Sequence, residues 1–391
     1  MTDLVDLLNQ SNYVFYFLIV DNSLDINLYP KLQNFHLIYA YTPANLSTLT
    51  DSHTPYFCLE EQKINLPEKN SGRLLSHPLV KNYIKETSKD KQVVIIPFKP
   101  SAKIDLICQQ NHWITASNPS KINRLLEDKI KFFHICEQNS IPIIPAAIDN
   151  FNQSNFQKYQ RTFGNKLIVQ THFGWAGKST HSFDSWNQAS KKIPIDTLVK
   201  YSPFLQGHTL LNNCCLTHLG LIQSPPALQY TGLSPFTNNP FATIGRQWPS
   251  FAPLKVISKI KTITQKLSIV LSNLSYKGYF GLDFFVHNNQ VFLLECNPRL
   301  TASFAFYTNL EISQKWTPLF YFHLAEFLNL NYKFDIEKET VRFLDQKIIG
   351  SEITQKNNQG VTIKKYHSPK PLSSQTQPIV LDPKLMKQLI K

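Results

Sequence analysis

Two acidic residues stand inside apolar stretches toward the end of the sequence. Asp283 interrupts the run 279–286, Glu295 ends the run 291–295, and the "HNNQ" between the runs is a hairpin signal. Side chains that face each other directly across such a hairpin have Cβ atoms about 4.5–5.5 Å apart. Because a buried carboxylate without a partner is costly, a facing pair of this kind requires a cation or hydrogen-bond donors.

The length of the connecting loop decides whether the two acids face each other. A three-residue loop at 288–290 pairs Asp283 with Glu295. A two-residue loop at Asn288-Asn289 puts them on opposite faces of the hairpin and weakens the case for a shared ligand. Both loop lengths are compatible with the sequence.

Facing carboxylates at this place predict a divalent metal site. Carboxylate oxygens are what Mg²⁺ binds, and Asn297, two residues beyond Glu295, adds a neutral oxygen on the same side. Arg299 can hold a phosphate or an oxyanion with its two-pronged guanidinium. The alternative is an exposed hairpin whose acids are solvated, and the apolar residues on both sides of each acid argue against it.

A second stretch with chemical potential is "THFGWAGKST", residues 171–180. It ends like a phosphate-binding P-loop, but the glycine that this motif needs five positions before Gly177 is replaced by His172. We therefore predict strands at 166–170 and 178–183, joined by a flexible glycine loop from which Lys178 can reach a phosphate. By itself the segment fits an ordinary surface hairpin better.

The elements that position these residues begin with an α/β unit. Apolar runs at 14–20, 35–41 and 93–98 predict buried parallel strands, and 113–119 closes the unit. No GxGxxG follows the first strand, so a dinucleotide site is not supported. 

A helix should follow Asn118-Pro119-Ser120 and run through Lys129 to about residue 139. Farther along the chain, 198–207 and 210–223 indicate strands. The stretch 230–253, which contains Arg246, is typical of a long loop, and 254–274 predicts an amphipathic helix.

Composition narrows the class of protein. The chain has 391 residues and a net charge of +13, with the lysines spread throughout, which favours anionic small molecules over a nucleic-acid partner. Its six cysteines form no CxxC pair, and the first residues carry no basic signal region, so we expect a cytoplasmic protein. The densest apolar run, 14–20, is far shorter than the roughly 20 residues of a membrane helix.

Taken together, the chain resembles the ATP-grasp superfamily. Its metal motif, an acid on one strand and E-x-N-P-R at the end of the next, is matched by Asp283 and by 295–299. The other parts follow in the family's order: an α/β pre-domain, a helix with a lysine, a glycine loop on a small β-subdomain and a hinge strand. The resemblance covers roughly residues 1–335, with a layout like biotin carboxylase and related carboxylate–amine ligases.

The resemblance implies a fold and its division. The fold class is α/β, α+β in the ATP-binding part, with a Rossmann-like pre-domain followed by an ATP-grasp fold. The expected domains are 1–120, then 121–335 with a small β lid at about 140–197, and a small basic segment at 336–391. Within that last segment 350–368 predicts a β-hairpin that packs on the ATP-binding part or contacts another subunit, as in a homodimer.

The resemblance also implies residue roles. ATP and Mg²⁺ (or Mn²⁺) are the expected cofactors, with Asp283, Glu295 and Asn297 on the metal and Arg299 and Lys178 as catalytic residues. Lys129 and Lys178 would touch phosphates, and Lys200 to Phe204 would line the adenine slot. Gln170 stands where many members have lysine. The expected ATP contacts are Lys129, Gln170, Gly174, Gly177, Lys178, Ser179, Lys200 and Tyr201.

The implied activity is an ATP-dependent carboxylate–amine ligase that works through an acyl-phosphate, with a small-molecule carboxylate and an amine as substrates. Two alternatives stay open. One is a bicarbonate-using, carboxylase-like enzyme of the same superfamily, and the other is a nucleotide- or polyanion-binding module without turnover.

Overall fold

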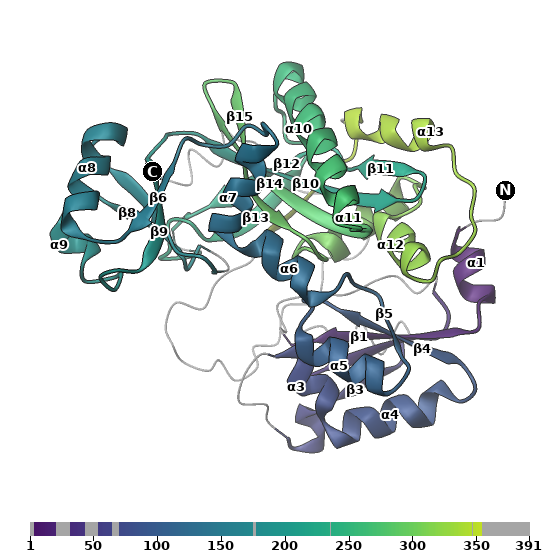
Figure 1. The fold of residues 1–391 in the computed structure, drawn as a ribbon. Helices are drawn as coiled ribbons and strands as arrows, with labels where there is room; N and C mark the ends of the chain where they lie inside the picture. Colours follow the sequence, from purple (N-terminus) through teal and green to yellow (C-terminus); the bar gives the residue numbers. More distant parts are fainter. Residues whose placement is uncertain are drawn as a thin grey trace.

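Three β-sheets follow one another along the chain (Figure 1). The structure, a computed structural model, describes residues 4–20, 32–43, 54–64, 70–174, 177–234, 236–345 and 347–353. Among the described helices, none combines the length and apolar character that crossing a membrane requires.

The first sheet is parallel and has five strands in the order β3-β2-β1-β4-β5. Its strands are β1 (Tyr13–Ile19), β2 (Phe35–Tyr39), β3 (Tyr56–Cys58), β4 (Gln92–Pro97) and β5 (Ile114–Thr115). The helices of this part are α1 (Leu4–Gln10), α3 (Ser71–Ser76), α4 (Pro78–Ser88) and α5 (Ala102–Gln110). The predicted Rossmann-like sheet of buried parallel strands is confirmed.

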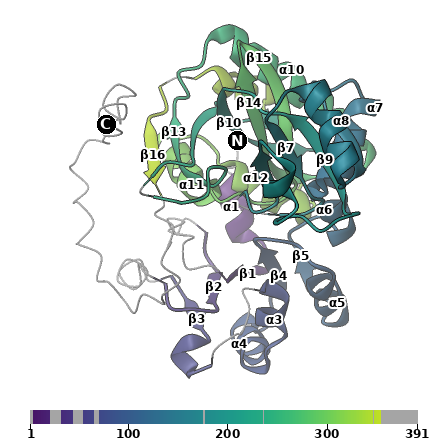
Figure 2. The same ribbon diagram turned by 90° about the vertical axis from the view of Figure 1, so that its left-hand side faces the viewer.

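Alternation along β1 explains why both faces of this sheet are buried. Tyr16 and Leu18 pack beneath α3, α4 and α5. Phe15 and Phe17 point the other way, and the Phe17 ring stacks on Phe304 with 5.5 Å between ring centroids. The sheet thus lies between its own helices and the body of the protein, as Figure 2 shows with the first sheet below.

The second sheet along the chain is small and antiparallel, with the strand order β6-β9-β7-β8. Its elements are β6 (Ala147–Asn150), α8 (Gln153–Phe163), β7 (Leu167–Gln170), β8 (Thr180–Phe183), α9 (Trp186–Ala189) and β9 (Leu198–Pro203). The strand pair predicted around the glycine loop is confirmed, because β7 and β8 pair across it. In Figure 1 this sheet and its two helices stand apart at the left.

The helix predicted across 121–139 is two helices, α6 (Ser120–Glu127) and α7 (Lys129–Gln138). Asp128 separates them with an extended backbone, and its carboxylate accepts hydrogen bonds from the Ile130 and Lys131 amides at 3.0 and 3.1 Å. Aspartate is a preferred N-cap because it satisfies amides that have no partner inside the helix. The break places Lys129 in the first turn of α7.

The largest sheet runs in the order β15-β14-β10-β12-β13-β16, with β11 paired to β10. Its strands are β10 (His208–Thr217), β11 (Gly220–Gln223), β12 (Ala227–Thr231), β13 (Thr243–Trp248), β14 (Gly278–His287), β15 (Gln290–Asn297) and β16 (Gly350–Ile353). The helices that follow or cover it are α10 (Leu254–Asn273), α11 (Phe304–Ser313), α12 (Leu319–Phe327) and α13 (Ile336–Val341). 

Two expectations change here. The long loop predicted at 230–253 is wrong in part, because β13 and the end of β12 lie within it and pair with each other. Arg246 is therefore a strand residue, and its guanidinium pairs with Glu352 of β16. The start of the predicted carboxyl-terminal hairpin joins the largest sheet as β16, which pairs with β13, and the rest of that hairpin lies outside the described residues.

The acid hairpin has the shorter of the two turns that the sequence allows but keeps the Asp283–Glu295 pairing expected for the longer one. Its turn has two residues, Asn288 and Asn289, both with positive φ (50° and 60°). A β-bulge then leaves Leu294 without a partner, so that Asp283 still lies opposite Glu295. The bulge restores the facing pair that a two-residue turn alone would have separated.

This turn yields a stability prediction. We expect Asn289→Val to lower the free energy of unfolding by about 1–2 kcal/mol, because a β-branched residue fits poorly at positive φ. Asn289→Gly, the matched control, should be neutral within about 0.5 kcal/mol, since glycine adopts this conformation freely. Urea unfolding of the three proteins measures the difference, and equal stability for all three would contradict the turn geometry.

Candidate active site

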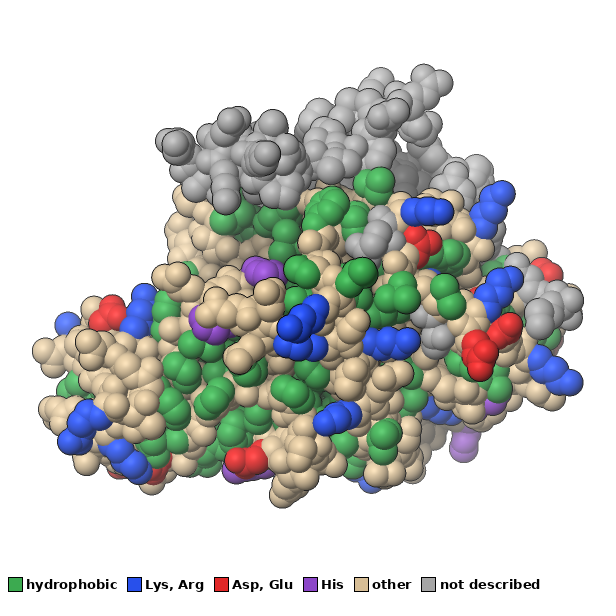
Figure 3. Space-filling model, turned by 90° about the horizontal axis from the view of Figure 1, so that it is seen from above, with side chains coloured by type: hydrophobic (Ala, Val, Ile, Leu, Met, Phe, Trp, Pro, Cys, Tyr) green, Lys and Arg blue, Asp and Glu red, His purple; other side chains and the backbone are tan. Residues whose placement is uncertain are grey.

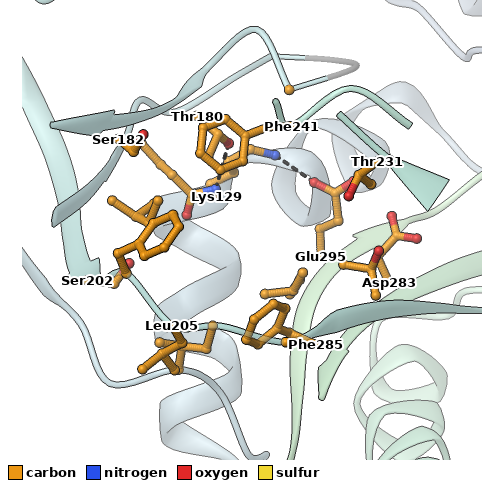
Figure 4. A pocket seen from close by; sticks show the side chains of 18 of the residues that line it. Lys129, Thr180, Ser182, Ser202, Leu205, Thr231, Phe241, Asp283, Phe285 and Glu295 are labelled. Atoms are coloured by element: carbon orange, nitrogen blue, oxygen red, sulfur yellow. Dashed lines mark hydrogen bonds and ion pairs between the residues drawn. The ribbon is translucent and has the colours of Figure 1, made fainter. Parts of the chain in front are cut away.

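A cavity of about 700 Å³ lies between the small sheet and the large sheet. The strands β7, β8 and β9 supply one wall, and β12, β14 and β15 supply the other. Figure 4 shows Thr180, Ser182 and Ser202 on the first wall, with Asp283 and Glu295 across from them. The cavity is thus a mixed site, with hydroxyl groups on one side and carboxylates on the other.

The carboxylate wall is organised around a lysine. The Nζ atom of Lys129 donates to Oε2 of Glu295 at 2.7 Å, and the lysine side chain is only 9% exposed (Figure 4). Asp283, opposite Glu295, accepts hydrogen bonds from the Gln229 amide and, at 3.1 Å, from the Asn297 amide. All three predicted metal ligands therefore lie together.

The charges of this wall depend on one another. Burial, together with the charge of Glu295, raises the pKa of Asp283. Burial alone would also raise the pKa of Glu295, but Lys129 outweighs it and the pKa falls below its usual value. Burial likewise opposes the charge on Lys129, yet the attraction of Glu295 and Asp283 raises the pKa of that lysine. Only Glu295 is in direct contact with an ammonium group, so Asp283 is left with hydrogen bonds from two amides and the more distant charge of Arg246.

Arg299 lies beside this wall and is held by a carboxylate from another element. Its Nε donates to Glu127 at 2.8 Å, and one of its Nη atoms donates to Oδ1 of Asn297 at 3.1 Å. Glu127 also pairs with Lys99 at 2.6 Å. Lys99 follows β4, so the chain of charges reaches from the first sheet to the acid hairpin. The Arg299 Cζ also lies 5.2 Å from the Phe98 ring centroid.

The glycine loop closes the cavity from the side of the small sheet. Gly174 and Gly177 line the cavity, and a Cβ on Gly177 would lie 2.7 Å from the backbone of Phe241 in the β12–β13 loop. The start of the loop is also anchored to α7, because the carbonyl of His172 accepts a hydrogen bond from the Lys129 amide at 2.9 Å. Close packing of two loops over the cavity requires glycine at this position.

The structure does not bring every expected residue of this loop to the cavity. Lys178 is exposed and lies outside the set of residues that line it, and Ser179 is buried beside it without lining it. The two are neighbours in a turn after Gly177, so their side chains point in different directions. The sequence showed only that a lysine was near glycines.

Strand alternation also corrects the hinge strand. Lys200 and Ser202 line the cavity, whereas Tyr201 between them is fully buried and stacks on Tyr159 with ring centroids 4.7 Å apart. The Tyr201 side chain therefore faces away from the cavity, because consecutive side chains of a strand point to opposite faces, and any contact from this position falls to its backbone. Gln170 lines the cavity and donates to the Thr180 hydroxyl at 2.9 Å.

Several residues of the site were missed from the sequence. Gln229 holds Asp283, Phe241 covers the glycine loop, and Glu127 and Lys99 hold Arg299. Gln229 lies in the alternating segment "ALQYT", a strand signal at the start of the predicted loop 230–253. The Lys99–Glu127 pair carries no local signal, because only the tertiary fold brings the two together.

The contact between the two loops can be tested directly. We expect Gly177→Ala to speed amide hydrogen exchange in 236–242, because the new methyl group would collide with Phe241. Gly164→Ala is the matched control: Gly164 also has positive φ, 104°, but no atom within 4 Å of an added Cβ. Exchange measured by mass spectrometry should change only in the first variant; the same change in both would mean that backbone strain, not the contact, is responsible.

Comparisons with known proteins agree with this geometry. A family model described as an ATP-grasp domain matches residues 126–303. A search of curated protein sequences gives no match. Among solved structures, N5-carboxyaminoimidazole synthetase from Staphylococcus aureus complexed with ADP is similar at 13% identity and a TM-score of 0.56, over 82% of this chain and 78% of that chain.

Two further structures share the architecture. The biotin carboxylase–β,γ-ATP complex from Campylobacter jejuni matches with 13% identity and a TM-score of 0.58, over 86% of this chain and 74% of that one. Phosphoribosylamine–glycine ligase from Thermotoga maritima matches with 14% identity and a TM-score of 0.52, over 78% and 76%. Residues 126–303 therefore match the ATP-grasp domain model, and most of the chain shares the fold of these ATP-grasp enzymes.

Proposed function

We propose that this protein is an ATP- and Mg²⁺-dependent carboxylate–amine ligase that works through an acyl-phosphate. The observation that carries the proposal is the facing pair Asp283 and Glu295, bound to Lys129, across one cavity from a glycine loop. The names of the structural neighbours, which include a phosphoribosylamine–glycine ligase, support the reaction class.

The acid wall fits a divalent metal ion on its own chemistry. It offers two carboxylates, the hard oxygen donors that Mg²⁺ prefers, and the side-chain oxygen of Asn297 lies beside them, where it accepts a hydrogen bond from Arg299. Lys129 is in contact with Glu295 alone, so Asp283 has no cation within ion-pair distance among the described residues. When bound, Mg²⁺ would neutralise phosphate oxygens and so lower the barrier to phosphoryl transfer.

The residues of this chain would position the reactants. The glycine loop covers the phosphates, and the hinge segment 203–207 lines the other end of the cavity for the base. Lys129 holds Glu295 in place and, once a second cation binds the acids, can turn its ammonium group to a phosphate oxygen. Arg299, anchored by Glu127, would stabilise charge on the transferred phosphoryl group.

The chemistry then needs no covalent residue of the protein. A carboxylate oxygen of the substrate attacks the γ-phosphorus, the bond to the β,γ-bridging oxygen breaks, and ADP leaves. The amine nitrogen attacks the acyl carbon, the bond from that carbon to the phosphate oxygen breaks, and inorganic phosphate leaves. Loss of one proton from nitrogen gives the amide. All six cysteines are free and buried, which suits a cytoplasmic site of action and leaves them no role in these steps.

The positive charge of the protein supports a small anionic ligand over a nucleic acid. On the face seen in Figure 3, lysine and arginine side chains stand apart, separated by apolar and uncharged groups. Binding of a nucleic-acid backbone favours a continuous basic stripe instead.

Calorimetric titration of ATP, with and without Mg²⁺, tests the proposal. We expect Mg²⁺ to tighten binding to the wild type, and Asp283→Asn to weaken Mg²⁺-dependent binding by at least about tenfold, because a ligand of the metal is lost. Asp149→Asn, which removes a carboxylate of the small sheet away from the cavity, is the matched control. Failure of the wild type to bind ATP would refute the proposal.

Turnover depends on the second acid. We expect Glu295→Gln to reduce Mg²⁺-dependent ADP release, assayed with a panel of carboxylates and amines, by roughly 100-fold or more, since it removes several kcal/mol of charge stabilisation. Circular dichroism should show an unchanged fold. Glu137→Gln, an exposed acid of α7, serves as control. Unchanged ADP release in Glu295→Gln would overturn the metal assignment.

A further inference from the structure

Lys200 is a lysine of the small sheet whose side chain lines the cavity near the glycine loop. It lies on β9 directly opposite Gln170 of β7, and both side chains line the cavity. Gln170 is the last residue of β7, so the glycine loop begins at this end. The hinge segment 203–207 lies at the other end of β9. Because the strands fix these positions, Lys200 stands at the loop end of the cavity.

The ammonium group of Lys200 has no anionic partner in the part of the chain that the structure describes. Its Nζ lies over the Phe133 ring, 5.8 Å from the centroid. Phe133 is one helical turn after Lys129 on α7, so the two ammonium groups lie along the same face of that helix. Lys129 forms an ion pair with Glu295 at 2.7 Å, whereas Lys200 feels the charge of Glu295 only at longer range. Burial and the charge of Lys129 lower the pKa of Lys200 to about 8.

The charges around the cavity show what is missing. Three lysines and two carboxylates line it, so one positive charge is left over before any metal ion binds. The third lysine, Lys166, is exposed and lies over the Phe204 ring at 4.2 Å, toward the hinge. The surplus charge at the loop end therefore belongs to Lys200. A divalent cation on the acids would add to this surplus and make an anion of several charges the complementary occupant.

We propose that Lys200 binds the phosphate chain of the nucleotide, as the cation that the small sheet contributes beside the neutral Gln170. This inference rests on the proposed function and deepens it, because it gives one side chain the task of recognising phosphate. Without a ligand, the charge of Lys200 destabilises the folded protein, because Lys200 is repelled by Lys129 and has no ion-pair partner.

Lys200→Met tests the proposal, because it removes the charge and keeps the length of the side chain. Titration calorimetry with ATP, adenosine and inorganic tripolyphosphate separates phosphate recognition from base recognition. We expect the variant to bind ATP and tripolyphosphate roughly 10- to 100-fold more weakly, the usual worth of a charged hydrogen bond. Adenosine should bind within about twofold of the wild type. Lys191→Met, an exposed lysine after α9, is the matched control.

Thermal unfolding of the empty proteins gives an independent readout. We expect Lys200→Met to melt at a higher temperature than the wild type, because a partly buried charge without an ion-pair partner is gone. A lysine that merely supported the fold would give the opposite sign.

Each outcome decides the proposal. Equal losses for ATP and adenosine would mean that Lys200 contacts the base, and ATP affinity within twofold of the wild type would mean that it contacts neither; both overturn the inference while the proposed function stands. Tripolyphosphate binding that depends on Lys200, without ATP binding, would support the inference and refute the proposed function. Binding of neither ligand to the wild type would refute both.

Discussion

The need to hold two carboxylates face to face inside a sheet governs the rest of the structure. Asp283 and Glu295 lie opposite each other on β14 and β15, where like charges repel. Lys129 supplies one compensating charge at 2.7 Å, and Gln229 and Asn297 supply hydrogen bonds. Each of these partners comes from a different element, so the positions of α7, β12 and the end of β15 are all set by this pair.

The break between α6 and α7 is the clearest consequence. An unbroken helix would carry Lys129 in mid-helix, with its amide bonded to a carbonyl one turn earlier. Because Asp128 caps a new helix, the Lys129 amide is free to bond the carbonyl of His172. The His172 ring in turn lies 3.0 Å from the Asp128 carboxylate. One aspartate thus joins the start of the glycine loop to the helix that serves the acid pair.

The features that could be predicted from the sequence are those that depend on local patterns of apolar and polar residues. They include the parallel strands of the first sheet, the strand pair around the glycine loop and the apposition of Asp283 with Glu295. Sequence reasoning could not choose the turn, because two asparagines with positive φ and a bulge at Leu294 reproduce the register of a longer loop. It did not show that the Tyr201 side chain points away from the cavity, because the direction of each side chain depends on where the strand begins. It also could not detect partners such as Glu127 and Lys99, which only tertiary packing brings together.

The ion pairs Lys99–Glu127 and Glu127–Arg299 connect the first sheet to the acid wall of the cavity. Lys99 lies just beyond β4, at the carboxyl end of a parallel sheet, where such folds place their ligand-binding loops. Through Glu127 it fixes the guanidinium that borders the acid wall. In the proposed ligase, loops at that sheet edge can change with the acceptor substrate while the cavity between the other two sheets stays the same. Arg299 contacts both regions, through Glu127 and through Asn297, so in the proposed reaction the orientation of its guanidinium would couple substrate binding to phosphoryl transfer.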